Sequence, residues 1–180
     1  MGKKYRLTDE TTTIVRNGAE ITLHRIQALR NFWDIKAGDL GGFVESEANL
    51  SHEGDCWIYD DAEVYGNAKV FGYAKVFGYA KVFGDAKIFG NALVYDNAEV
   101  YGNAKVYGSA KVSNNAEVYD NTDVYGNAKV YGNALVYDNA EVYGNAKVYG
   151  ETEVYGNAWV FGSAVVYGMN KVCGDTELST

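Results

Sequence analysis

The sequence predicts an all-β solenoid whose repeating unit is six residues long. An aliphatic residue occupies every sixth position from Ile58 to Leu178, which makes 21 consecutive units, and a small residue, Ala in most units, follows four positions later. The composition agrees, since 21 Gly, 16 Tyr and no Pro is a bias typical of an internal repeat. Without Pro, every backbone N–H can take part in a hydrogen-bonded ladder.

A typical unit, VYGNAK, predicts a short strand followed by a tight corner. The Val side chain points inward and its neighbours Lys and Tyr point outward, because side chains alternate along a strand. Gly, Asp or Asn follows two positions after the aliphatic residue, and these residues tolerate a positive φ. A helix is excluded, since a period of six does not match 3.6 and a Gly or Asn in every turn would cost roughly 1 kcal/mol each.

This spacing of an aliphatic and a small residue resembles the hexapeptide-repeat, left-handed parallel β-helix family. In that family three units form one triangular coil, which implies about seven coils and a prism about 34 Å long. Upstream, the segments GDLGGFVES (38–46) and NLSHEGDCWIYDDA (49–62) resemble the start of YdcK-type bacterial hexapeptide proteins, which are described as transferase-like.

We expect two parts, an N-terminal β cap at residues 1–43 and the β-helix at residues 44–180. Within the cap, residues 11–26 predict a β-hairpin that turns at Asn17 and Gly18, a residue pair typical of two-residue hairpin turns. A solenoid exposes an apolar cross-section at each end. The hairpin is therefore expected to cover the first coil.

The opening of the helix breaks the phase of the repeat. Val44 and Leu50 are six positions apart, but neither is in phase with Ile58. The sequence therefore predicts an insertion of two residues near residues 52–54.

Every third unit lies on the same face of a triangular coil, so the outward residues of each face can be read directly. The first face carries a lysine ladder: Trp57, Lys75, Leu93, Lys111, Lys129, Lys147 and Val165. The second face is mainly acidic: Glu63, Lys81, Glu99, Glu117, Leu135, Glu153 and Lys171. The third face is mixed: Lys69, Lys87, Lys105, Asp123, Glu141, Trp159 and Glu177. A column of Tyr and Phe runs beside each of them.

Stacked aromatic residues stabilise a parallel sheet. However, like charges on neighbouring strands repel each other, and the aromatic columns are larger than the apolar patch that a monomer normally exposes. We therefore predict a cyclic trimer in which the lysine face of one chain lies near the acidic face of the next. The resemblance also implies a trimer. The predicted oligomer or binding residues are Lys75, Lys111, Lys129, Lys147, Tyr95, Tyr131, Tyr149, Glu99, Glu117, Glu153, Tyr101, Tyr119 and Tyr137.

The sequence gives no strong catalytic candidate. The resemblance implies, for an acyltransferase, a histidine general base near bound acyl-CoA, but the chain holds only His24 and His52. His24 falls in the cap, and no unit from Ile58 to Leu178 is lengthened into a lid. We assign no catalytic residue, keep His52 as a weak candidate, and expect no cofactor unless the chain is an acyltransferase, which would use acyl-CoA.

Three functions remain open. The first is a non-catalytic structural or binding scaffold that forms a homo-oligomer and interacts with a protein or a small ligand through its faces or inter-subunit grooves. The second is an acyl-CoA-dependent acyltransferase of the hexapeptide-repeat type. The third is a phage or mobile-element protein that sequesters a host component or a nucleotide ligand by ring stacking and charge.

Charge and composition exclude other partners. A net charge of −8 and a pI near 4.7 argue against nucleic-acid binding. We expect no membrane contact and a cytoplasmic location, because no segment approaches the roughly 18 apolar residues of a membrane span. Cys56 and Cys173 lie near opposite ends of the array, so we expect neither a disulfide nor a metal site.

Overall fold

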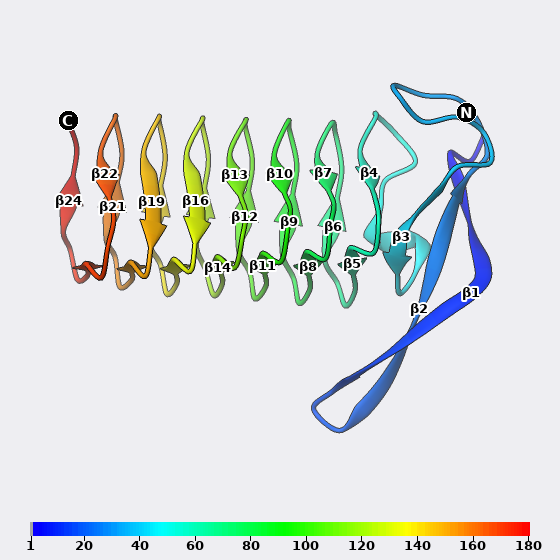
Figure 1. Cartoon of the computed structure of the whole chain (residues 1–180), viewed down its shortest axis with the longest axis horizontal. Coiled ribbons are helices and arrows are strands. Elements are labelled where there is room, and N and C mark those ends of the chain that lie inside the picture. Colours follow the sequence, from blue (N-terminus) through cyan, green and yellow to red (C-terminus); the bar gives the residue numbers. More distant parts are fainter. Residues whose placement is uncertain (1) are drawn as a thin grey trace.

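The computed structural model describes residues 2–180 and shows a parallel β-solenoid preceded by an antiparallel hairpin (Figure 1). The hairpin consists of β1 (Tyr5–Arg16) and β2 (Ala19–Ala28), and it is followed by β3 (Leu40–Val44) and the short 3-10 helix η1 (Glu47–Asn49). The all-β class and the hexapeptide solenoid are confirmed. The left-handed sense of the coil stays a prediction.

Three parallel sheets form the walls of the solenoid, and we name them by their outward residues. The lysine face consists of β4 (Trp57–Ile58), β7 (Lys75–Val76), β10 (Leu93–Val94), β13 (Lys111–Val112), β16 (Lys129–Gly132), β19 (Lys147–Gly150) and β22 (Val165–Val166). The acidic face consists of β5 (Glu63–Val64), β8 (Lys81–Val82), β11 (Glu99–Val100), β14 (Glu117–Val118), β17 (Leu135–Val136), β20 (Glu153–Val154) and β23 (Lys171–Val172). The mixed face consists of β6 (Lys69–Val70), β9 (Lys87–Ile88), β12 (Lys105–Val106), β15 (Asp123–Val124), β18 (Glu141–Val142), β21 (Trp159–Val160) and β24 (Glu177–Leu178).

The aliphatic residues of the repeat form the core, as predicted. Val94 pairs in register with Val76 on one side and Val112 on the other, and all three are completely buried. The alanines four positions after them are buried at the corners in the same continuous cluster. Each coil therefore places its aliphatic and small side chains on those of the next coil.

The corners show why the third position of each unit is Gly, Asp or Asn. Gly108 has a φ of +69°, and a Cβ atom there would lie 2.9 Å from the backbone nitrogen of Gly126 in the next coil. Asp96 and Asn114 adopt the same left-handed conformation, with φ of 60° and 58°. These are the residue types that tolerate it best after Gly.

The opening coil contains the predicted two-residue insertion. Val44 pairs with Val64 and Leu50 with Val70, whereas Ile58 pairs with Val76, two residues closer in the sequence. The expected count of seven coils needs a correction. The solenoid has about eight turns, because β3 and Leu50 add an incomplete coil before the first regular one.

The hairpin turns at Asn17 and Gly18 as predicted, with Arg16 opposite Ala19. It begins earlier than expected, at Tyr5, and pairs through β2 with β3. Its base closes the first coil, since Tyr5 and Ile26 are fully buried in the main core.

The rest of the hairpin reaches the acidic face. Leu23 forms a separate buried cluster with Tyr65 and Phe83, and Arg16 lies 3.9 Å over the ring of Phe83. The cap therefore covers one end of the solenoid, as predicted, and also part of one wall, which the sequence did not predict.

Two further findings bear on the expectations. Cys56 is buried and Cys173 exposed, and both are free thiols. Within residues 2–180, no helix is long and apolar enough to cross a membrane.

Candidate functional site

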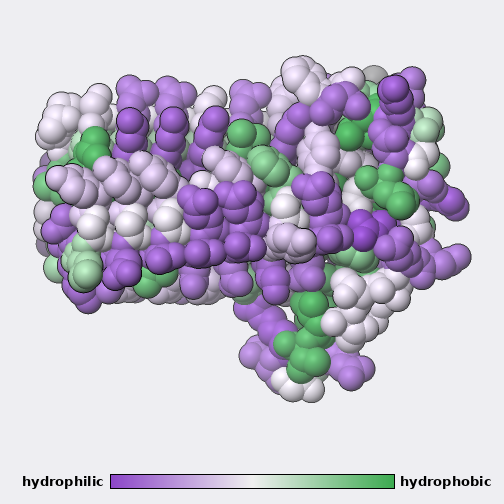
Figure 2. Space-filling view, viewed as in Figure 1, coloured by the Kyte–Doolittle hydropathy of each residue, from purple (hydrophilic) through white to green (hydrophobic). Residues whose placement is uncertain are grey.

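The lysine ladder forms as predicted and is short of counter-charges. Lys111, Lys129 and Lys147 pair in register on three consecutive strands, and all three are at least partly exposed. None of them forms an ion pair with any residue in 2–180, whereas Lys75 on the same face lies 3.6 Å from Asp34. Rows of hydrophilic side chains run along the solenoid (Figure 2). Three adjacent cations without partners make this part of the lysine face an attractive surface for an anion.

The aromatic column beside these lysines is interrupted. The rings of Phe77 and Tyr95 stack at 4.8 Å, and those of Tyr131 and Tyr149 at 4.7 Å, but the coil between them carries Ser113. A hollow of about 320 Å³ opens there, lined by Tyr95, Asp96, Lys111, Ser113, Asn114, Lys129, Tyr131 and Lys147. Sequence reasoning placed the tyrosines and lysines correctly and missed the hollow.

The acidic face has more internal partners than the lysine face. Glu117 lies beside Glu99 in register and accepts a 2.9 Å hydrogen bond from the hydroxyl of Tyr101. Burial, together with this bond to a carboxylate, raises the pKa of Tyr101. Glu153 accepts bonds from Tyr137 at 3.3 Å and from Lys171 at 3.0 Å. The charges of the acidic face are therefore partly compensated within the chain.

A larger hollow of about 680 Å³ lies where the opening coil meets the mixed face. Its walls are Glu45, Ser46, Ala48, Asn49, Gly66, Asn67, Lys69, Asp85, Lys87, Asn103 and Lys105. Several of its polar groups bond each other: Glu45 accepts from the backbone of Gly66 at 2.7 Å, and the side-chain amide of Asn67 donates to Asp85 at 3.0 Å. The hollow is lined by both acidic and basic side chains. The opening coil that forms part of it does not follow the six-residue repeat, so the repeat did not predict this hollow.

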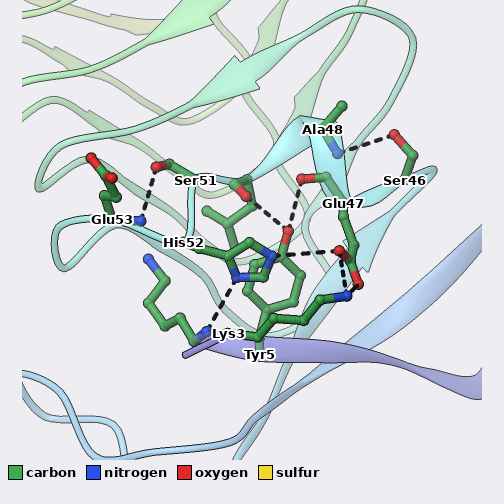
Figure 3. A network of polar contacts seen from close by, with 10 residues as sticks. Lys3, Tyr5, Ser46, Glu47, Ala48, Ser51, His52 and Glu53 are labelled. Atoms are coloured by element: carbon green, nitrogen blue, oxygen red, sulfur yellow. Dashed lines mark hydrogen bonds and ion pairs between the residues drawn. The ribbon is translucent and has the colours of Figure 1, made fainter. Parts of the chain in front are cut away.

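His52 contacts residues of the cap and the opening coil (Figure 3). Its Nδ1 accepts the backbone N–H of Lys4 at 3.2 Å, its Nε2 lies 3.6 Å from a carboxylate oxygen of Glu47, and its ring stacks on Tyr5 at 4.4 Å. Glu47 is also bonded to Lys3 at 2.7 Å, and this bond is the main reason that the pKa of Glu47 is lowered. A general base needs a free nitrogen facing a substrate. The Nδ1 atom of His52 is already occupied, and its Nε2 atom is buried beside Glu47.

His24 is likewise held within the cap. Its Nδ1 lies 3.3 Å from the backbone oxygen of Thr8. The cap also holds a buried lysine that sequence reasoning missed. Lys4 donates to the backbone oxygen of Cys56 at 2.8 Å and lies 3.3 Å from its sulfur, and burial lowers the pKa of Lys4 and raises that of Cys56. These contacts fasten the first strand to the opening coil.

No cluster of three or more His, Cys, Asp or Glu side chains suited to a metal ion occurs in residues 2–180. The site that the geometry presents is the exposed lysine column together with the gap in the aromatic column beside it.

The fold and the unit length define the chain as a hexapeptide-repeat β-solenoid. The model of the YdcK β-solenoid repeat family matches residues 154–168. A protein of Escherichia coli strain K12 described as uncharacterized acetyltransferase YdcK is 39% identical over 62 residues, which cover 32% of this chain and 19% of that protein. Both matches support a relationship of this chain to the YdcK-type family. The aligned region spans about a fifth of the length of the Escherichia coli relative.

Proposed function

We propose that this chain is a non-catalytic scaffold that assembles into a cyclic trimer, with the lysine face of each copy against the acidic face of the next. The observation that supports it most is the run of Lys111, Lys129 and Lys147 without counter-charges. Like charges in register destabilise a sheet, and a neighbouring carboxylate column would remove that repulsion. A contact between two different faces closes into a ring when the rotation allows it, and a three-sided prism suits a threefold ring.

Light scattering coupled to size exclusion tests the assembly. We expect three times the 19.7 kDa chain mass at low salt and dissociation as salt screens the charges. A chain that is monomeric at micromolar concentration whatever the salt would refute the trimer.

A charge exchange tests which faces meet. The variant Lys111→Glu/Lys129→Glu/Lys147→Glu should remain monomeric, and so should Glu99→Lys/Glu117→Lys. In the first variant both contacting faces are acidic, so neighbouring copies repel each other. In the second variant both contacting faces are basic, with the same result. Coexpression of the two variants should restore association between unlike chains. If both variants assemble like the unaltered chain, these faces do not form the contact.

The second candidate is an acetyltransferase, favoured by the description of the Escherichia coli relative. The hydrogen bond to Nδ1 of His52, the burial of its Nε2 atom and the unbroken walls argue against it in this chain. Acetyl-CoA hydrolysis or transfer to amine acceptors that disappears in His52→Gln, with the fold retained, would decide in favour of the enzyme.

A further inference from the structure

The gap at Ser113 is the single internal break in three otherwise continuous aromatic columns. From Tyr59 to Tyr167, all units of the repeat except the one with Ser113 carry Tyr or Phe directly after the buried aliphatic residue. Neighbouring rings in these columns are mostly parallel, such as Tyr101 and Tyr119 at 4.8 Å with 1° between their planes. A serine at this rung forgoes two stacked pairs that each contribute about 0.2 to 1 kcal/mol elsewhere in the sheet.

The gap has the dimensions of one aromatic ring. Strands in a sheet are ~4.8 Å apart, so the rings of Tyr95 and Tyr131, two rungs apart, are separated by ~9.6 Å. A planar ring inserted midway would lie ~4.8 Å from each of them, within the 4.5 to 7 Å range typical of aromatic pairs. It would take the place of the missing side chain above Ser113, in the hollow of about 320 Å³.

The charge around the gap is positive. Lys111 and Ser113 flank the buried Val112 and face the same side of the chain, roughly 6.6 Å apart along it, which a lysine side chain can span. Lys129 and Lys147 line the same hollow. The one carboxylate there, Asp96, already accepts the backbone N–H of Asn114 at 3.2 Å and its side-chain amide at 3.1 Å.

We infer that the break at Ser113 is a binding slot for a small molecule that carries an anionic group on a planar aromatic ring system, as a nucleoside monophosphate does. The ring stacks between Tyr95 and Tyr131, and the anionic group is held by the neighbouring lysines. Nothing in the slot requires a second copy of the chain. In the proposed trimer these lysines face the acidic column of the neighbouring copy, so an anionic ligand in the slot would compete with that contact.

Calorimetric titration tests this with two probes, adenosine 5′-monophosphate and naphthalene-2-sulfonate. We expect at least one of them to bind once per chain. Adenosine and cyclohexanesulfonate, which lack the charge or the flat ring, should bind at least tenfold more weakly. Ser113→Tyr fills the slot without changing any charge, and we expect it to weaken probe binding at least tenfold.

Tyr119→Ser is the matched control, because it opens a gap of the same shape between Tyr101 and Tyr137 on the acidic face. In the double variant Ser113→Tyr/Tyr119→Ser, the probe should not recover its affinity. Absence of binding by both probes, or equal affinity in the chain and in Ser113→Tyr, would overturn the inference. Light scattering distinguishes failure of the slot from failure of the trimer. Ser113→Tyr should assemble as the unaltered chain does. If the unaltered chain is a monomer and still binds the probe, only the trimer is refuted.

Discussion

Filling the gap at Ser113 with tyrosine should make the solenoid more stable. The new ring would stack on Tyr95 and Tyr131, which adds two aromatic pairs of about 0.2 to 1 kcal/mol each. Ordering the new side chain offsets part of this gain. We expect the free energy of unfolding to rise by about 1 kcal/mol, which corresponds to about 2 to 4 °C in Tm for a chain of this size.

The opposite change is available in the same molecule. Tyr119 stacks on Tyr101 at 4.8 Å and on Tyr137 at 5.1 Å, so Tyr119→Ser removes two pairs and should lower Tm by a similar or larger amount. Both variants can be followed by circular dichroism during heating and by urea unfolding. If Ser113→Tyr lowers Tm, or if Tyr119→Ser leaves it unchanged, ring stacking does not stabilise the coil as we argue.

Three further predictions concern the corners, the tyrosines and the cap. Gly108→Ala should lower the free energy of unfolding by about 2 kcal/mol or more in urea, whereas Gly168→Ala, with φ of +78° and open space around its Cβ, should lower it by only about 1 kcal/mol. Burial raises the pKa of Tyr65 to about 12, so stability present below pH 10 should decline as pH rises from about 10 to 12, and Tyr65→Phe should flatten this decline in unfolding measured against pH. His52→Phe removes the acceptor for the backbone N–H of Lys4 and should lower the free energy of unfolding by about 1 to 3 kcal/mol, measured by urea unfolding.

The repeat could be predicted in detail because its determinants are local. A buried aliphatic residue, a left-handed corner and a small residue recur within each unit, and they determine which residues share a face, as the pairing of Lys111 with Lys129 confirms. The register between distant segments is a different matter. The stacking of Arg16 on Phe83 depends on how the hairpin leans against the wall, and no pattern in either segment encodes that angle.

The candidate site shows the same division. The lysine and tyrosine columns followed from the period, but the pairing of Lys75 with Asp34 did not, because Asp34 comes from an irregular segment of the cap. The gap was in principle readable, since SNN at residues 113–115 stands where most units have an aromatic residue followed by Gly or Asp.

In an array of nearly identical units, a specific site has to arise where one unit departs from the others. The insertion near His52 is such a departure, but the hydrogen bond from Lys4 to His52 fastens the cap. Thr122 is another, but its hydroxyl donates to the backbone oxygen of Tyr119 at 2.7 Å, so it supports the corner. Ser113 differs from both, because it forms no such support and opens a hollow beside cations that lack partners. A departure that weakens the coil and exposes a charged slot is better explained by a ligand than by folding, since natural sequences accept lower stability where binding requires it.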